Sequence, residues 1–103
     1  MTTPRSRAMP RAGERRARIY YAGQVQGVGF RITADRAASS IGLAGFVRNL
    51  EDGRVEVVCE GPQGAIEEFM RKMASVFRAY INDVDAEWSP ATGEFAGFEI
   101  RFD

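Results

Sequence analysis

The stretch ARIYYAGQVQGVGFRITADRAASSI, residues 17–41, is the most informative part of the sequence about the fold. It begins as a β-strand, because Ile19 and Tyr21 share one face of residues 17–22 and polar or amphipathic side chains occupy the other. From Phe30 onward the apolar spacing becomes that of an amphipathic helix. The apolar side chains of this helix are Phe30, Ala34, Ala37, Ala38 and Ile41. The stretch therefore predicts a strand, a glycine-rich loop and a helix in direct succession.

The rest of the chain continues this alternation of strands and helices, after a helix stop at Gly42. The predicted elements are a strand at 44–50, a strand at 54–60, a helix that starts at Gly61-Pro62, a strand at 80–88 and a last strand at 97–102. The order β-α-β-β-α-β with a short fifth strand is typical of the α+β ferredoxin-like split βαβ fold. We therefore expect one antiparallel sheet with both helices on one face.

Side-chain alternation assigns the two faces of the predicted sheet. The inner positions are Val55, Val57 and Cys59 on one strand, and Phe98, Ile100 and Phe102 on the last strand. The outer positions of residues 54–60 are Arg54, Glu56, Val58 and Glu60. This outer row lacks the stacking rings that an RNA-binding sheet uses, so the pattern disfavours RNA recognition by this fold.

The loop from Gly23 to Gly29 is the first candidate site. Between a strand and a helix, consecutive backbone N–H groups can converge on an anion, and the helix N-terminus adds partial positive charge. Arg31 stands in the first helical turn, where its planar fork suits a phosphate or carboxylate. The alternative is structural, with the glycines forming a tight turn and Arg31 pointing to solvent. The local chemistry favours the anion site.

Asn49, at the end of the strand 44–50, is the second candidate. It shares a strand face with Val47, so it lies at the rim of the core if Val47 is buried. A functional interpretation makes it a group that positions water beside the anion. A structural interpretation has it capping the turn that contains Asp52-Gly53. The spacing alone does not decide between them.

Composition sets limits on the class of protein. The chain has 103 residues, which suits one domain, and it has no histidine and a single cysteine, Cys59. We expect neither a metal site nor a cofactor, and Cys59 alternates with apolar residues as a buried, inert thiol would. No apolar run has the length of a membrane span, and the arginine-rich N-terminus contains no apolar stretch, so we expect no secretory signal. We therefore expect a cytoplasmic monomer that does not associate with membranes.

The charge is unevenly distributed, although the net charge is zero. Residues 1–18 contain six arginines and one glutamate, a charge of +5, so residues 19–103 carry −5. An acidic body argues against a general nucleic-acid binder. We expect residues 1–15 to form a disordered basic tail and residues 16–103 to form the folded domain.

Two stretches together resemble the signatures of the acylphosphatase family. Gly23-Gln24-Val25-Gln26-Gly27-Val28-Gly29-Phe30-Arg31 is similar to the pattern G-x-V-Q-G-V-x-F-R, and Gly45-Phe46-Val47-Arg48-Asn49 is similar to the second signature. The resemblance extends from about Arg16 to Phe102, so residues 16–103 are identified as an acylphosphatase-like domain. It implies hydrolysis of the carboxyl-phosphate bond of a small acyl phosphate.

The resemblance also implies roles for particular residues. Arg31 would bind the substrate phosphate and Asn49 would orient the attacking water. The substrate-binding positions would be the loop amides of Gln26, Gly27, Val28, Gly29 and Phe30. The segment 74–80 departs from the Gly-Pro-Pro-rich connection frequent in bacterial members, and it either lengthens the preceding helix or exposes aromatic side chains.

Two other classes of function stay open at this point. The first is a ferredoxin-like regulatory module that binds phosphate or a carboxylate metabolite without reacting. The presence of both Arg31 and Asn49 counts against it, because such a module needs no water-positioning group. The second is an RNA-binding domain, which salt-sensitive RNA binding would support.

Overall fold

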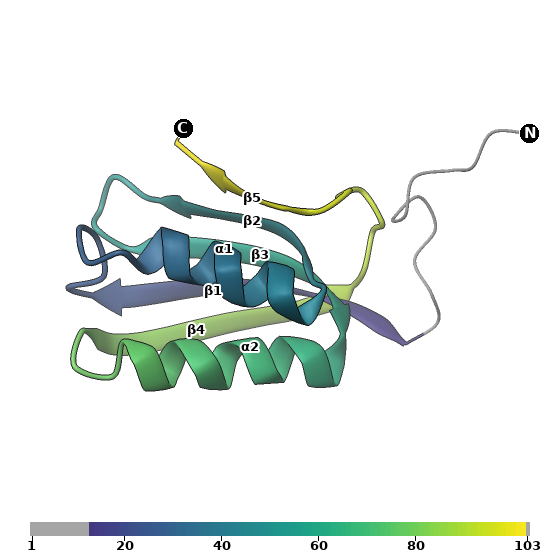
Figure 1. Cartoon of the computed structure of the whole chain (residues 1–103), viewed down its shortest axis with the longest axis horizontal. Helices are drawn as coiled ribbons and strands as arrows, with labels where there is room; N and C mark the ends of the chain where they lie inside the picture. The colour runs from purple at the N-terminus through teal and green to yellow at the C-terminus, as the bar shows by residue number, and fades with distance from the viewer. Residues whose placement is uncertain (1–12, 103) are drawn as a thin grey trace, which may run out of the picture.

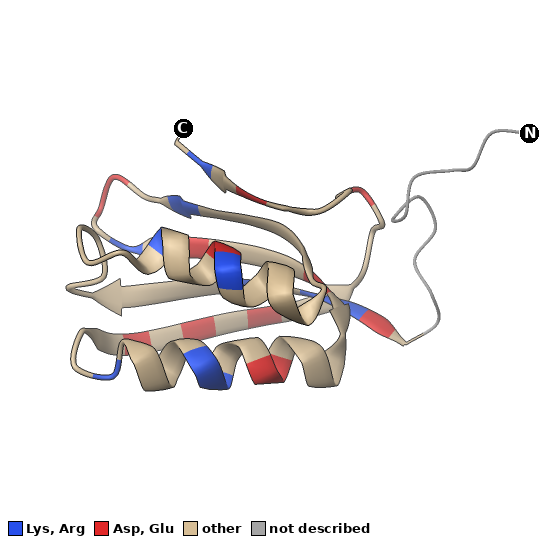
Figure 2. Ribbon diagram, viewed as in Figure 1, with Lys and Arg blue, Asp and Glu red and all other residues tan. Residues whose placement is uncertain are grey.

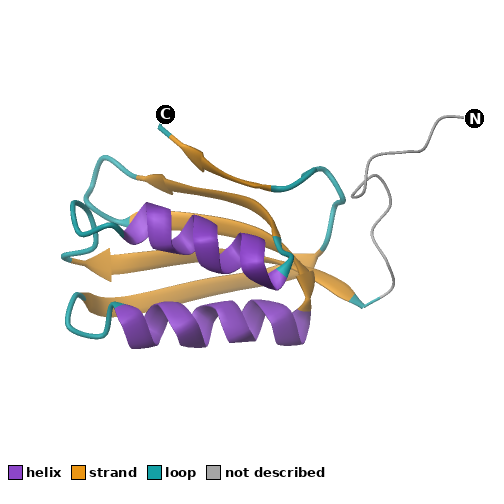
Figure 3. Ribbon diagram, viewed as in Figure 1, coloured by secondary structure: helices purple, strands orange, loops and turns teal. Residues whose placement is uncertain are grey.

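The computed structural model describes residues 13–102, and its elements follow the predicted order. The elements are β1 (Glu14–Gly23), α1 (Phe30–Ile41), β2 (Ala44–Asn49), β3 (Val55–Pro62), α2 (Gln63–Val76), β4 (Ile81–Pro90) and β5 (Phe98–Arg101). Both helices lie on the same face of one five-stranded sheet, as Figures 1 and 3 show. This arrangement confirms the predicted ferredoxin-like α+β fold.

The strand order in the sheet is β4-β1-β3-β2-β5. β1 pairs antiparallel with β3 and β4, and β2 pairs antiparallel with β3. The strands β1 and β3 are therefore central, while β4 and β5 form the two edges. The end of β2 and the loop after β1 lie at the same end of the sheet, because β1 and β2 run in the same direction on either side of β3.

The main core lies between the helices and the sheet. Its strand residues include Ile19 and Tyr21 from β1 and Val55, Val57 and Cys59 from β3, all within 1% exposure, as the alternation predicted. From the helices, Phe30 and Ala34 of α1 and Ile66, Phe69 and Met73 of α2 complete it. Burial of such apolar surface is the main stabilising contribution to the fold.

The fifth strand corrects the prediction of an antiparallel sheet, because β5 pairs parallel with β2. After β4 the chain crosses the end of the sheet through residues 91–97 and reverses its direction before β5 begins. β2 also runs opposite to β4, because the three pairings that lead from β4 through β1 and β3 to β2 are all antiparallel. β5 and β2 therefore point the same way, and the sheet is mixed.

Glu56 and Glu60 lie on the outer face of β3, as the alternation predicted, but both are buried, which the sequence did not indicate. Glu56 accepts hydrogen bonds from Arg18 and Arg48, and Glu60 accepts one from Arg16 at 3.1 Å. Glu60 also accepts the backbone N–H groups of Thr92 and Gly93, both at 2.9 Å. Its carboxylate therefore fixes the crossing segment 91–97 to the sheet.

A second small cluster covers the same outer face. Val58, predicted to point outward, is completely buried and packs with Phe46 and Phe95. The rings of Phe46 and Phe95 meet edge to face with centroids 6.0 Å apart. The period-two pattern correctly placed Val58 on the face opposite the helices, but it carried no information that the crossing segment would cover that face.

Several boundaries differ from the predicted ones. β1 begins at Glu14, so the last two residues of the predicted tail 1–15 belong to a strand, while residues 1–12 lie outside the described residues. Residues 74–76 form the last part of α2, which ends at Val76, and Tyr80 in the following turn is 41% exposed, so the segment 74–80 is partly helical and also exposes an aromatic side chain. Phe102, predicted to be buried, is 81% exposed because β5 ends at Arg101. None of the helices in the described part of the chain has the length and apolar character needed to cross a membrane.

Candidate active site

The loop between β1 and α1 ends in a helix start that carries no side-chain cap. Gly27 and Gly29 both have φ of 82°, in the left-handed region that favours glycine. Gly29 is the N-cap residue of α1, and no acidic side chain lies in the first turn. The first N–H groups of a helix lack intrahelical partners and carry partial positive charge. The helix start therefore offers backbone donors to an anion.

The side chain of Gln26 ties this loop to the turn between β2 and β3. Its Nε2 donates to the carbonyl oxygen of Leu50 at 2.8 Å and to that of Arg54 at 2.9 Å. Leu50 directly follows Asn49, the last residue of β2. The hydrogen bonds of Gln26 therefore hold the loop against the end of β2, although β3 separates β1 from β2 in the sheet.

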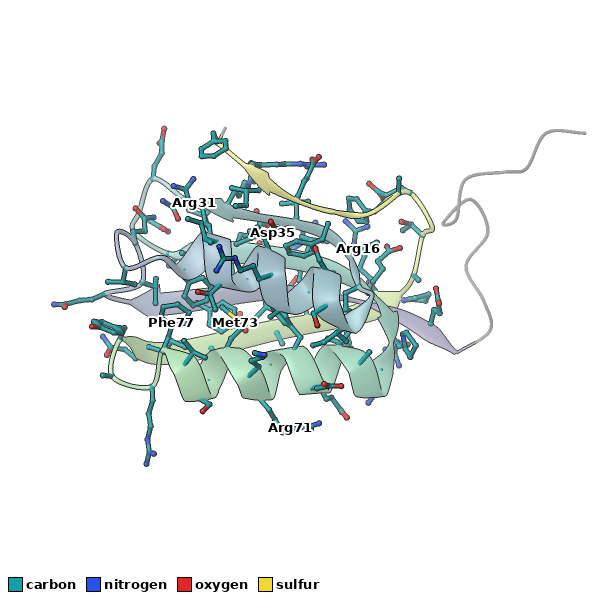
Figure 4. The ribbon with its side chains drawn as sticks, viewed as in Figure 1. Arg16, Arg31, Asp35, Arg71, Met73 and Phe77 are labelled. Carbon is teal, nitrogen blue, oxygen red and sulfur yellow. The ribbon has the colours of Figure 1, made fainter. Side chains whose placement is uncertain are left out.

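A pocket of about 190 Å³ opens where the loop, the start of α1 and the end of β2 meet. Its lining residues are Val25, Gly27, Gly29, Phe30, Arg31, Ile32 and Asn49. Figure 4 shows Arg31 at the N-terminal end of α1, on the side nearer β2. The two candidate residues that the sequence identified, Arg31 and Asn49, thus lie at one pocket.

The predicted substrate-binding positions divide into two groups. Gly27, Gly29 and Phe30 line the pocket, whereas the side chain of Gln26 binds the neighbouring turn and that of Val28 packs against the core. Val25 and Ile32 also line the pocket, although the sequence pattern did not identify them as site residues. Ile32 follows Arg31 in the first helical turn, so its place next to a candidate anion-binding residue could have identified it as a pocket residue.

The structure also bears on the alternative role of Asn49 as a turn cap. The turn from residue 50 to 54 closes through backbone bonds between Leu50 and Arg54 and between Gly53 and Leu50. The carboxylate of Asp52 accepts the backbone N–H of Arg54 at 3.0 Å. These bonds close the turn without the Asn49 side chain, which lines the pocket instead.

The charge around the pocket favours an anionic ligand. Among the described residues, none of those that line it is acidic, and Arg31 contributes a cation. Figure 2 shows acidic residues along β4, which is at the opposite edge of the sheet from β2 and β5. Within residues 13–102, no three His, Cys, Asp or Glu side chains gather as metal ligands would. The donors available at the pocket are therefore backbone amides, a guanidinium and a carboxamide.

The buried nucleophilic side chains of the core are poorly suited to react. Burial, with a further contribution from Glu60, raises the pKa of the Cys59 thiol to about 12. Burial also raises the pKa of the Tyr21 hydroxyl well above its ordinary value. Cys59 is buried in the core, as the sequence predicted, and its raised pKa disfavours the thiolate, which is the reactive form of cysteine.

The fold and the pocket together define a small α+β protein with a pocket at a strand-loop-helix junction, lined by Arg31 and by the start of α1. The family model described as Acylphosphatase matches residues 17–100. The chain is 44% identical over 88 residues to an acylphosphatase of Rubrobacter xylanophilus, covering 84% of this chain and 80% of that protein. The crystal structure of acylphosphatase from Bacillus subtilis superposes with a TM-score of 0.77 at 33% identity, over 84% of this chain and 98% of that one.

A second curated relative agrees, an acylphosphatase of Roseiflexus sp. that is 44% identical over 86 residues, covering 82% of this chain and 92% of that protein. The chain therefore belongs to the acylphosphatase family.

Proposed function

We propose that this protein hydrolyses the carboxyl-phosphate bond of small acyl phosphates, giving a carboxylate and inorganic phosphate. The observation that carries the proposal is the single pocket at which Arg31, Asn49 and the uncapped start of α1 meet. Membership of the acylphosphatase family supports the same reaction. The backbone amides of the loop 26–30 hold the phosphate together with the guanidinium of Arg31.

In this proposal Asn49 orients the attacking water. Water attacks phosphorus, the bond between phosphorus and the acyl oxygen breaks, and the bonding electrons leave with the carboxylate. Both protons of the water remain on the inorganic phosphate. A carboxylate is a weak base, so it departs without a general acid, and catalysis depends on positioning and charge stabilisation. The proposal therefore needs neither a cofactor nor a metal ion.

The test is phosphate release from benzoyl phosphate by the wild type and by Arg31→Ala, both in the presence of EDTA. Release by the wild type alone supports the proposal. We expect the rate to stay nearly constant between about pH 6 and 8, because neither a guanidinium nor a carboxamide changes its protonation there. A bell-shaped profile or inhibition by EDTA would contradict the mechanism. Phosphate binding without release would favour the regulatory module.

We also propose that the protein acts as a cytoplasmic monomer on a small-molecule substrate and not on nucleic acid. Three arginines of the sheet's outer face, Arg16, Arg18 and Arg48, pair with the carboxylates of Glu56, Glu60 and Glu94, so these six side chains together carry no net charge. This balance argues against the excess positive charge that nucleic acid attracts. Light scattering would measure the oligomeric state, and a filter-binding titration with RNA at low salt would reveal nucleic-acid affinity.

A further inference from the structure

Phe102 makes an unusual contact for so exposed a side chain. It is 81% exposed, more than any other large apolar side chain in the described part of the protein. Its ring lies under the guanidinium of Arg31, with Cζ 4.8 Å from the ring centroid. This separation is within the range of an attractive cation–π interaction. The contact therefore joins the residue directly after β5 to the cation that lines the pocket.

The parallel pairing of β5 with β2 explains how Phe102 reaches this position. Val47 is opposite Ile100, and Arg48 is opposite Arg101. Two parallel neighbouring strands have their C-terminal ends at the same end of the sheet. Asn49 and Phe102, the residues that follow these pairs, therefore lie at the same end of the sheet. An antiparallel β5 would have placed its last residue at the opposite end, away from Arg31.

We propose that Phe102 is a positioning residue for Arg31, and the proposal rests on the proposed function of the pocket. An arginine side chain loses considerable rotamer freedom when it is fixed in one place. Contact with the ring restricts the guanidinium before substrate arrives, so less ordering remains for the binding step. A cation–π contact does not occupy the guanidinium N–H groups as a hydrogen bond to an acceptor would, so these groups remain available for phosphate oxygens.

The direct test compares Phe102→Leu, which keeps an apolar side chain without a ring, with Phe102→Tyr, which keeps the ring. In Phe102→Leu we expect the Kd for inorganic phosphate to rise about 2- to 10-fold, with kcat/KM for benzoyl phosphate falling by a similar factor. Phe102→Tyr should stay within about 2-fold of the wild type. A Phe102→Leu variant that binds phosphate as the wild type does would overturn the proposal.

Two controls separate positioning of Arg31 from a general effect on β5. Arg101→Lys, on the same strand, keeps its charge and removes the planar guanidinium that lies 4.0 Å over Phe46, and it should leave phosphate binding unchanged. In an Arg31→Ala background, Phe102→Leu should weaken phosphate binding no further, because the ring then has no cation to hold. An equal effect of Phe102→Leu with and without Arg31 would show that the ring acts on the fold instead.

An NMR measurement keeps this inference distinguishable from the proposed function. The Nε–Hε resonance of Arg31 should be displaced by the ring current in the wild type and in Phe102→Tyr, and should move toward its ordinary position in Phe102→Leu. This readout does not depend on turnover. If the ring current is present and phosphate binding responds to Phe102 while benzoyl phosphate is not hydrolysed, only the proposed reaction fails. An unchanged Arg31 resonance in Phe102→Leu would overturn the positioning role even in an active enzyme.

Discussion

The Nε2 of Gln26 lies 2.8 Å from the carbonyl oxygen of Leu50, and this hydrogen bond joins the loop after β1 to the end of β2. The sheet alone does not bring these two segments together, since β3 separates their strands. A second bond from the same amide reaches the carbonyl oxygen of Arg54 at 2.9 Å. The exposed side chain of Gln26 therefore helps to fix the position of the loop between β1 and α1 relative to Asn49.

We predict that Gln26→Met weakens this connection while it preserves the size of the side chain. Both donors are lost, and the free energy of unfolding should fall by about 1 kcal/mol, because water can satisfy the exposed carbonyl oxygens. The kcat/KM for benzoyl phosphate should fall by about 10-fold, since the loop is no longer held against Asn49. Urea unfolding and steady-state kinetics measure the two effects.

Gln24→Met provides the matched control for this prediction. Gln24 is an exposed residue of the same loop, and its side chain makes no hydrogen bond among residues 13–102. We expect Gln24→Met to match the wild type in both measurements. If Gln26→Met loses stability but keeps full activity, the two hydrogen bonds serve the fold and do not align the site.

Arg31→Lys should fail to support hydrolysis although it keeps the positive charge. A lysine provides a point charge in place of the planar fork that binds two phosphate oxygens at once. We expect kcat/KM for benzoyl phosphate to fall about 100-fold or more. Arg36→Lys, an exposed arginine on the same helix, should stay within about 2-fold. Turnover near that of the wild type in Arg31→Lys would remove the guanidinium from the mechanism.

For Asn49→Ala we expect a loss of kcat with little change in phosphate affinity. The carboxamide acts on the attacking water in the proposed mechanism, so kcat should fall by about 10- to 100-fold while the Kd for inorganic phosphate stays within about 3-fold. Asn82→Ala, an exposed asparagine on β4 at the far edge of the sheet, is the control and should have no effect. A parallel loss of phosphate affinity would instead identify Asn49 as a ligand of the anion.

The sequence predicted the layer arrangement because local patterns determine it. The alternation of Ile19 and Tyr21 and the helical spacing from Phe30 identify their buried faces without any long-range information. The sequence could also identify Arg31 and Asn49 as candidates. The glycine-rich loop places Arg31 at a helix start, and the strand alternation places Asn49 at a strand end. The pocket confirms that both lie together, while their chemical roles stay predictions.

The features that the sequence did not predict depend on long-range contacts. The burial of Glu56 and Glu60 requires arginines from other strands and the segment 91–97. The parallel pairing of β5 results from the path of that same segment across the sheet. Phe102 is exposed because β5 ends at Arg101. The apolar alternation of residues 98, 100 and 102 continues past that point, so it gave no sign of where the strand ends. A period-two pattern separates two faces of a strand but does not tell what covers each face.

The carboxylate of Glu56 should make stability depend on pH in the acidic range. Burial by itself raises the pKa of Glu56, but hydrogen bonds from Arg48 and Arg18 and their positive charges outweigh it, so the pKa lies below the ordinary 4.5. A depressed pKa means that the folded chain favours the charged form. The stabilisation is therefore complete above pH 4.5 and is lost as the pH falls from there through the folded-state pKa.

Glu56→Gln tests this dependence directly, because glutamine keeps the shape but carries no charge. At pH 7 the substitution should lower the free energy of unfolding by about 1–3 kcal/mol, and the difference from the wild type should shrink in urea titrations near pH 3. Glu99→Gln, in an exposed pair with Arg101 at 2.8 Å, should change stability by less than about 0.5 kcal/mol at either pH. A Glu56→Gln deficit of equal size at pH 7 and pH 3 would show that packing around the side chain, and not its charge, stabilises this face of the sheet.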